Sequence, residues 1–264
     1  MLTSSSGLGI GTTPAALVAH GIDTTVVELD PVVHKFASKY FQLPANHTAV
    51  IEDAVTYTAR LAADDTAARY DYIIHDVFTG GAEPIALFTL EFMQNLDTLL
   101  KPNGVVAIVR PPFPSPSPMI PRVNIPSQNY AGDFALPPPR IILNTITSVF
   151  PSCRMFREHP RDDADFAASG RDFTNMVIFC TKRAEAIVFR TPTERDMLNS
   201  PSRQAFLLPQ HEVREEEFVG GEEADGVVLR RNETERLVKW HEMSAMGHWT
   251  VMRTVLPEVV WEAW

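Results

Sequence analysis

Short apolar runs alternate with amphipathic segments along residues 7–110, and this alternation restricts the fold more than any other feature of the sequence. The runs are five to seven residues long and rich in β-branched side chains, as buried strands are: 24–30, 48–52, 70–76 and 105–109. The segments between them have helical spacing: 13–20, 31–41, the stretch from 53 to 60, and 88–100. Strands joined by helices form parallel sheets of βαβ units. The sequence therefore predicts an α/β, Rossmann-like fold with a mostly parallel sheet and helices on both faces.

Proline interrupts this alternation, because ten of the 29 residues from 111 to 139 are proline. Proline donates no backbone hydrogen bond and disrupts helices, so this segment is expected to be a loop or lid rather than a central strand or a long helix. Regular structure is expected to resume with a helix at 140–150. An antiparallel C-terminal hairpin of strands 153–158 and 176–181 would follow, its strands joined by a polar loop. We assign residues 1–183 to one Rossmann-like domain.

The remaining residues, 184–264, differ in composition from the first part of the chain and are predicted to form a C-terminal extension. Residues 211–226 are charged and spaced by glycine, which favours a solvated acidic loop. A helix is expected at 232–246. All four tryptophans lie between Trp240 and Trp264, and such an apolar tail is expected to dock on its own domain or on a partner chain.

The composition excludes several classes of partner. The formal net charge is −10, which opposes binding to nucleic-acid backbones and to anionic membranes. No apolar run approaches the roughly 20 residues that span a bilayer, and the first residues lack the basic and apolar parts of a secretory signal. We therefore expect a cytoplasmic protein that binds neither nucleic acid nor membrane and that can form a homodimer.

Cysteine and histidine usage agrees with that expectation. Two cysteines, Cys153 and Cys180, are too few for a disulfide scaffold. They would lie near each other if their two strands pair, but in a reducing cytosol we expect free thiols. His241 and His248 are seven residues apart, which is not the spacing that places two zinc ligands on one helix face, so no metal is expected.

Four features that suit nucleotide binding occur in order along the first half of the chain. Gly7, Gly9 and Gly11 precede a predicted helix, where glycine lets the backbone and its N–H groups approach a ligand. Glu28 lies 17 residues beyond Gly11, near the end of the next strand, where a carboxylate can accept hydrogen bonds from ribose hydroxyls.

Two further carboxylates follow the next two strands. Asp53, with Ala54 beside it, follows one strand and is placed to receive an adenine amine, although it could instead cap the helix that begins there. Asp76 ends the strand after that and is the candidate base, with a cap or turn as the alternative. Ligands of open α/β sheets bind at the carboxyl ends of strands, where all these residues are expected.

The segments GLGIGTTPAALVAHG, VVELDP, IEDA, YDYIIHDVFTGG and LFTLEFMQNLDTLLKPNGVVAI together resemble the catalytic domain of the spermidine synthase-like, S-adenosylmethionine-dependent transferases. The resemblance is good over 7–110, loose over 140–183 and slight beyond. It implies that the glycine loop passes the methionine part of S-adenosylmethionine or decarboxylated S-adenosylmethionine. It further implies that Glu28 holds the ribose, Asp53 holds adenine, and Asp76 takes a proton from the attacking amine.

The chain departs from that family at positions that matter for the reaction. Aminopropyltransferases carry an Asp in the glycine loop and a second one shortly after the catalytic Asp, whereas this chain has Ile10 and Thr79 there. These carboxylates help to bind a diamine, and each charge-assisted hydrogen bond contributes roughly 1.5–3 kcal/mol. In addition, residues 1–6 offer only Leu2 as a clear core residue. We therefore expect that the strand before the glycine loop, and the N-terminal region that covers the family's substrate site, are missing through truncation or loss.

Three hypotheses follow from these features. The first is methyl transfer from S-adenosylmethionine to an amine or another small acceptor, with Asp76 as base. The second is aminopropyl transfer in polyamine biosynthesis. The third is a degenerate, non-catalytic homologue that acts as a binding partner through its tryptophan-rich tail.

Overall fold

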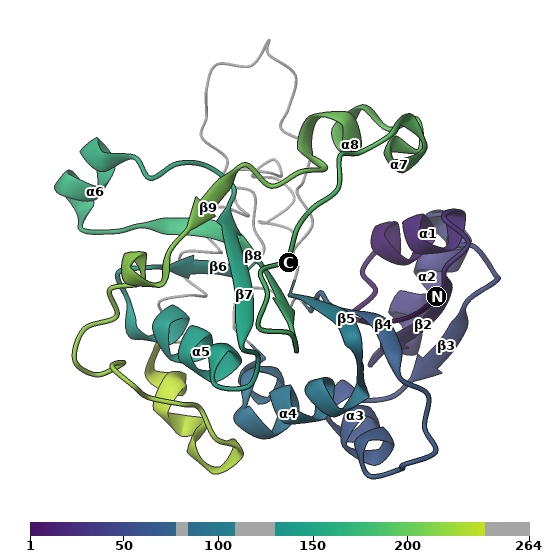
Figure 1. Cartoon of the computed structure of the whole chain (residues 1–264), viewed down its shortest axis with the longest axis horizontal. Coiled ribbons are helices and arrows are strands. Elements are labelled where there is room, and N and C mark those ends of the chain that lie inside the picture. Colours follow the sequence, from purple (N-terminus) through teal and green to yellow (C-terminus); the bar gives the residue numbers. More distant parts are fainter. Residues whose placement is uncertain (78–83, 109–129, 241–264) are drawn as a thin grey trace, which may run out of the picture.

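A nine-stranded mixed sheet organises the protein in the computed structural model, which describes residues 1–77, 84–108 and 130–240 (Figure 1). The strand order is β3-β2-β1-β4-β5-β8-β7-β9, and β6 also pairs with β8. The first five strands run parallel and the later ones antiparallel. The strands are β1 (Leu2–Ser6), β2 (Asp23–Glu28), β3 (Thr48–Ile51), β4 (Tyr70–His75), β5 (Leu100–Ile108), β6 (Tyr130–Asp133), β7 (Ser152–Arg157), β8 (Phe173–Thr181) and β9 (His211–Val213). The predicted Rossmann-like fold with an antiparallel C-terminal part is confirmed.

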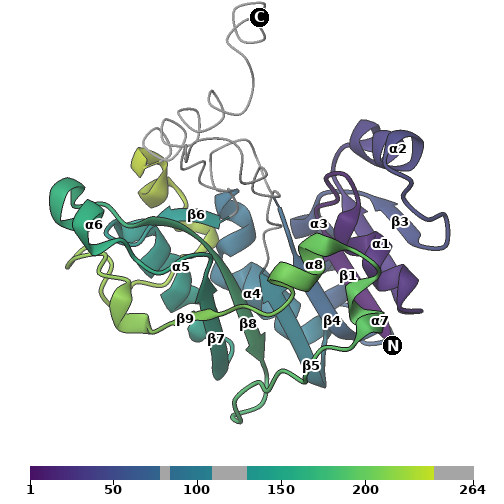
Figure 2. The same cartoon turned by 90° about the horizontal axis from the view of Figure 1, so that it is seen from above.

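Helices cover both faces of this sheet (Figures 1 and 2). The five long helices are α1 (Thr12–Ala19), α2 (Pro31–Tyr40), α3 (Ala54–Ala62), α4 (Leu90–Leu99) and α5 (Pro137–Thr147). The short elements are η1 (Ile85–Phe88), α6 (Asp163–Ser169), α7 (Glu194–Met197), α8 (Pro201–Phe206), η2 (Glu215–Glu217) and η3 (Arg231–Glu233). Helices α3, α4 and α5 pack side by side over the large core, whereas α2 contributes to a smaller core around Val26 on the other face. None of the described helices has the length and apolar character needed to cross a bilayer.

Local sequence explains where these helices begin. Asp30 accepts a hydrogen bond from the Val32 N–H and precedes a proline at the first position of α2, which satisfies one of the unpaired N–H groups of the first turn. Asp53 caps α3 in the same way. Three consecutive prolines, 137–139, begin α5, where the missing N–H groups cost no helical hydrogen bond. The segment that we expected to be a loop as far as 139 therefore ends earlier, in β6 and the first turn of α5, and residues 111–129 lie outside the described part.

The expectation of a missing first strand is wrong. Strand β1 pairs in parallel with β2 on one side and β4 on the other, although Thr3 to Ser6 are all polar. These four side chains are buried, and Ser6 Oγ lies 3.1 Å from His75 Nδ1. Backbone hydrogen bonding to two neighbours holds the strand in the centre of the sheet, so apolar side chains are not required there.

Three other local expectations also need correction. Residues 101–104, which separate the helix expected at 88–100 from the strand expected at 105–109, form an irregularity within β5 where its pairing with β4 shifts. The polar loop between β7 and β8 contains helix α6. The acidic stretch 211–226 contains the edge strand β9, and Val213, Phe218 and Ala224 are buried in the large core. Helix α6 and strand β9 were not predicted because most of their residues are polar and only a few face the interior.

The cysteines form a disulfide rather than free thiols. Cys153 and Cys180 lie opposite each other in the β7–β8 ladder, with Sγ atoms 2.04 Å apart. The sequence allowed for their proximity, but only the antiparallel register places the two Cβ atoms face to face.

Candidate functional site

The glycine loop follows β1 at the centre of the sheet and fits tightly against the end of β4. Gly7 has φ +83°, and a Cβ atom on it would lie 2.0 Å from the carbonyl oxygen of Asp76. The Gly7 N–H donates to Val27 O at 3.0 Å, while the Asp76 N–H donates to Ser6 O at 2.9 Å. Only glycine suits both this backbone conformation and this close approach.

The remainder of the loop turns outward and presents its backbone. Gly11 has φ +86° and packs against Leu43, to which an added Cβ would approach within 2.9 Å. Gly9 has φ +53° with open space around it, and both Gly9 and Ile10 are exposed. Within the described residues, the N–H groups of Gly9 and Ile10 have no hydrogen-bond partner. Two unpaired donors before the N-terminus of α1 are suited to a polar or anionic ligand group.

Glu28 ends β2 and connects the glycine loop with the start of α2. Its Oε2 accepts from the Leu8 N–H at 3.0 Å, and its Oε1 accepts from the Asp30 N–H at 2.9 Å. The carboxylate is half-buried, and each oxygen can accept one more hydrogen bond. Glu28 therefore shapes the loop and still has acceptor capacity for a pair of hydroxyl groups.

Asp53 follows β3, at the edge of the sheet. Its Oδ2 accepts from the Thr56 N–H at 3.0 Å and from the Thr56 hydroxyl at 2.9 Å, so the capping role left open by the sequence is present. Its Oδ1 has no partner among the described residues, and the side chain is exposed. Ala54 is half-buried as the first residue of α3. Capping and acceptance of an amine are thus compatible at Asp53.

Asp76 directly follows β4, next to the glycine loop. The sheet order places it at the point where connections from β1 and β4 run to opposite sides, which is where ligands of open α/β sheets bind. The residue is half-buried. The carboxyl ends of β3, β2, β1 and β4 therefore bring Asp53, Glu28, the glycines and Asp76 into one row, in that spatial order.

His75 lies on the other face of β4, packed against Phe88 and Phe92 with ring centroids 5.4 and 5.3 Å away. Burial lowers the pKa of His75 to about 4, so its ring is neutral near pH 7. Its Nε2 has no hydrogen-bond partner in the described structure. Side chains alternate along a strand, so His75 and the next residue, Asp76, point to opposite faces.

Sequence reasoning missed three exposed apolar side chains that border this row. Leu29 is 70% exposed, Ile10 53% and Ile51 45%, and each adjoins the glycine loop, Glu28 or Asp53. Apolar residues next to strand-end carboxylates were the available signal, but their exposure depends on the fold.

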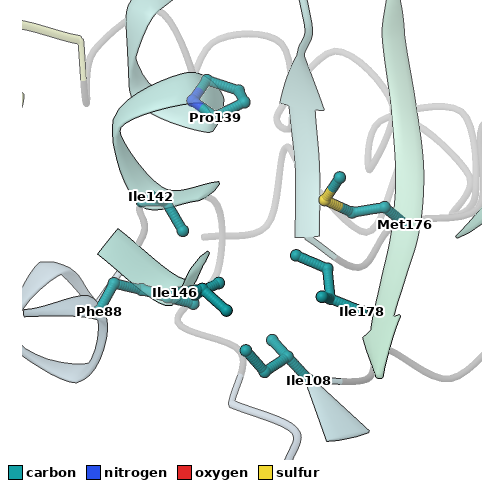
Figure 3. A pocket seen from close by; sticks show the side chains of 7 residues that line it. All are labelled: Phe88, Ile108, Pro139, Ile142, Ile146, Met176 and Ile178. Atoms are coloured by element: carbon teal, nitrogen blue, oxygen red, sulfur yellow. The ribbon is translucent and has the colours of Figure 1, made fainter. Parts of the chain in front are cut away.

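A small cavity elsewhere in the protein is a different feature (Figure 3). Its volume is about 10 Å³, and its lining is entirely apolar, from η1, β5, α5 and β8: Phe88, Ile108, Pro139, Ile142, Ile146, Met176 and Ile178. Such a space holds about one water molecule and offers no polar partner for it, so it is a packing defect rather than a ligand site. Thr79 and most of the tryptophan-rich tail lie outside the described residues.

Comparisons with known proteins agree with this geometry. Residues 7–115 match the spermine/spermidine synthase domain, which includes the glycine loop and all three carboxylates. Over these residues the chain is similar to the spermine/spermidine synthase domain, and we refer to this part as the spermidine synthase-like domain. The resemblance drawn from the motifs is thereby confirmed.

Two curated relatives were found. Over 265 aligned residues the chain is 49% identical to an N-terminal histidine N-methyltransferase of Emericella nidulans, which covers 98% of this chain. A polyamine aminopropyltransferase of Vibrio vulnificus is 36% identical over 104 residues and covers 38% of the chain. The chain spans 43% of the length of the first relative and 34% of the second.

Solved structures show the same fold at low identity. A probable spermidine synthase from Corynebacterium glutamicum superposes with a TM-score of 0.55 at 20% identity, covering 87% of this chain and 71% of that one. Human methyltransferase-like protein 13 in complex with SAH gives a TM-score of 0.51 at 20% identity, with 80% and 83% coverage. The spermidine synthase-like domain thus has the architecture of both transferase types.

Proposed function

We propose that this spermidine synthase-like domain binds S-adenosylmethionine and transfers its methyl group to a nitrogen atom. The observation that carries the proposal is the row of donors and acceptors at the carboxyl edge of the sheet, in a chain 49% identical to a protein named as a histidine N-methyltransferase. The acceptor class that this relative suggests is a histidine at the N-terminus of a peptide or protein.

The residues present fit the proposed ligand. The unpaired N–H groups of Gly9 and Ile10 would face its methionine part, and the free acceptor capacity of Glu28 would take the ribose hydroxyls. Asp53 Oδ1 would accept from the adenine amine between the exposed side chains of Leu29 and Ile51. All of these groups belong to β-strand ends or to the turns that follow them, which keeps them in place before a ligand arrives.

S-adenosylmethionine would supply a methyl carbon already activated by a positive sulfur atom. The nitrogen lone pair of the acceptor forms the new N–C bond, the C–S bond breaks, and sulfur keeps its electron pair. If that nitrogen bears a proton, Asp76 would receive it; the half-buried position of Asp76 at the end of β4, beside the glycine loop, supports this role. The chain thus contributes alignment and proton transfer.

The replacement of two family carboxylates by Ile10 and Thr79 supports a methyl acceptor over a diamine. Aminopropyl transfer remains the second candidate, favoured by the match to the spermine/spermidine synthase domain. A variant with Ile10→Asp and Thr79→Asp should gain affinity for a diamine if the acceptor pocket otherwise suits one.

A direct assay separates these functions. The protein is incubated with S-adenosylmethionine labelled in its methyl group, with peptides that begin with histidine or with alanine, and with putrescine as a diamine. Label transfer to the histidine peptide by the wild type, its loss in Asp76→Asn, and retained ligand binding by that variant would support the proposal. In a parallel reaction that contains decarboxylated S-adenosylmethionine and putrescine, formation of the aminopropylated product, detected by its mass, would favour the second candidate.

Thermal melting tests the third hypothesis, a non-catalytic homologue. A ligand present at about 100 times its Kd stabilises the folded protein by roughly 2.7 kcal/mol. No shift with S-adenosylmethionine, together with no label transfer, would show that the site does not bind it and would support a role as a binding protein. Glu28→Ala is the matched variant, in which the shift should disappear.

The disulfide bears on the compartment. Cys153–Cys180 joins two adjacent strands, and disulfides persist in oxidising compartments but are rare in the cytosol. This favours an oxidising compartment over the cytoplasmic location expected from the sequence. Trapping of free thiols in freshly lysed cells, followed by mass analysis, checks it.

A further inference from the structure

Two histidines from different elements meet at the edge of the sheet. His34 lies on α2, and His47 lies just before β3, at the edge of the sheet where α2 and β3 are neighbours (Figure 1). Their Nε2 atoms are 3.0 Å apart, and both side chains are partly buried. Neither residue belongs to the row of groups assigned to S-adenosylmethionine.

A backbone carbonyl determines which nitrogen of His47 carries a proton. His47 Nδ1 lies 2.6 Å from Pro44 O, and because a carbonyl oxygen only accepts, Nδ1 must carry the proton. In the tautomer that carries only this proton, the lone pair of His47 Nε2 faces His34. A backbone carbonyl that orients an imidazole through its second nitrogen is the usual support of a metal-binding histidine.

We propose that His34 and His47 form a two-histidine site for a divalent transition-metal ion such as Zn²⁺ or Cu²⁺. A metal–nitrogen distance of about 2.05 Å and the observed 3.0 Å separation would give an N–metal–N angle of about 94°. Opening to a tetrahedral angle requires the nitrogens to move apart by about 0.3 Å and both rings to turn so that their Nε2 lone pairs converge on the metal. Metal binding would also require the proton on His34 Nε2 to move to His34 Nδ1, so that both rings bind the metal in their neutral form.

The site lacks further protein ligands within the described ranges, where no group of three or more histidine, cysteine, aspartate or glutamate residues converges. Water would therefore complete the coordination, as the partial exposure of both rings allows. Imidazole nitrogen suits Zn²⁺, Cu²⁺ and Ni²⁺, whereas Mg²⁺ and Ca²⁺ prefer oxygen. The expected order of affinity is Cu²⁺ above Zn²⁺, with no binding of Mg²⁺.

Occupation of this site would act on the glycine loop through Leu43. Residues 41–47 connect the two histidine-bearing elements, and Leu43 in this connection packs against Gly11 and belongs to the same small core as Leu8. A metal bound to both histidines would restrict this connection and the packing beneath the loop. Zn²⁺ should consequently raise the thermal midpoint of the protein whether or not the domain is an active transferase.

The test is titration of the metal-free full chain with Zn²⁺ by calorimetry. The wild type should bind one Zn²⁺ at this site, and His34→Gln and His47→Gln should each weaken binding at least about tenfold. His159→Gln is the matched control, because His159 is 75% exposed and lies apart from the pair. A double variant of His241 and His248, which lie in the tail, should also bind as the wild type does.

Two results would overturn the proposal: no Zn²⁺ binding by the wild type, or the same binding in both His34→Gln and His47→Gln. The histidine pair would then be only a hydrogen bond between two rings. Electron paramagnetic resonance of the Cu²⁺ form needs no variant, so it remains decisive even if a substitution impairs folding. Coupling to two imidazole nitrogens is expected, and coupling to fewer than two contradicts the site.

Discussion

Replacement of Gly7 by alanine should strongly destabilise the junction between the glycine loop and β4. A non-glycine residue at φ +83° costs about 1–2 kcal/mol in backbone strain. The added Cβ would also lie 2.0 Å from the Asp76 carbonyl, and relieving such a clash by backbone movement costs about 1–3 kcal/mol. The free energy of unfolding should therefore fall by about 2–5 kcal/mol.

Gly9→Ala is the matched control, since Gly9 also has a positive φ, +53°, but nothing lies within 4 Å of an added Cβ. Only the backbone term applies there, so a loss of about 1–2 kcal/mol is expected. Urea unfolding monitored by circular dichroism measures both losses, provided that the m-value is the same in the two variants and the wild type. Equal losses in the two variants would refute the reasoning, because they would show that the contact between Gly7 and Asp76 contributes nothing.

Three further predictions follow from buried groups. The pKa of His75 is about 4 in the folded protein but near 6.5 when unfolded, so the unfolded chain binds more protons between these two pH values. The free energy of unfolding should therefore fall by about 3 kcal/mol from pH 6.5 to pH 4. His75→Leu should flatten this part of the pH profile, as measured by denaturant titrations. The double variant Cys153→Ala/Cys180→Ala removes a cross-link between residues that are 27 positions apart in the sequence. The free energy of unfolding should fall by about 2–4 kcal/mol, seen as a lower thermal midpoint, and an unchanged midpoint would contradict this prediction. Arg157 donates to Asp172 at 3.0 Å with both side chains at most 7% exposed, so Arg157→Met should cost about 3–5 kcal/mol in urea unfolding, and adding Asp172→Leu should recover part of that loss.

Much of the fold could be predicted because its parallel part is built from local signals. The short apolar runs became β2, β3, β4 and the end of β5, and the helical spacing gave α1 to α4 within a few residues. The positions of the glycines, Glu28, Asp53 and Asp76 at strand ends also predicted that they meet at the carboxyl edge, whereas the sheet order β3-β2-β1-β4 decided which of them are neighbours there. Each of them follows a strand, and parallel strands place their ends together.

Other parts depend on contacts that no local pattern encodes. Strand β1 is made of buried Thr and Ser residues and exists because β2 and β4 satisfy its backbone on both sides. Strand β9 is three residues long and is defined by its pairing with β7. In each case the stabilising partner is distant in sequence, so polar composition alone indicated a loop.

The sequence by itself determined which chemical groups the edge of the sheet would carry, because strand ends and glycine turns are local features. Tertiary structure decided what those groups do. In the folded protein Glu28 also accepts hydrogen bonds from Leu8 and Asp30, and Gly7 packs closely against Asp76. Cys153 forms a disulfide with Cys180, and the Nε2 atoms of His34 and His47 lie 3.0 Å apart. These relations depend on the register between strands and the packing of helices, which arise only when distant segments share one core.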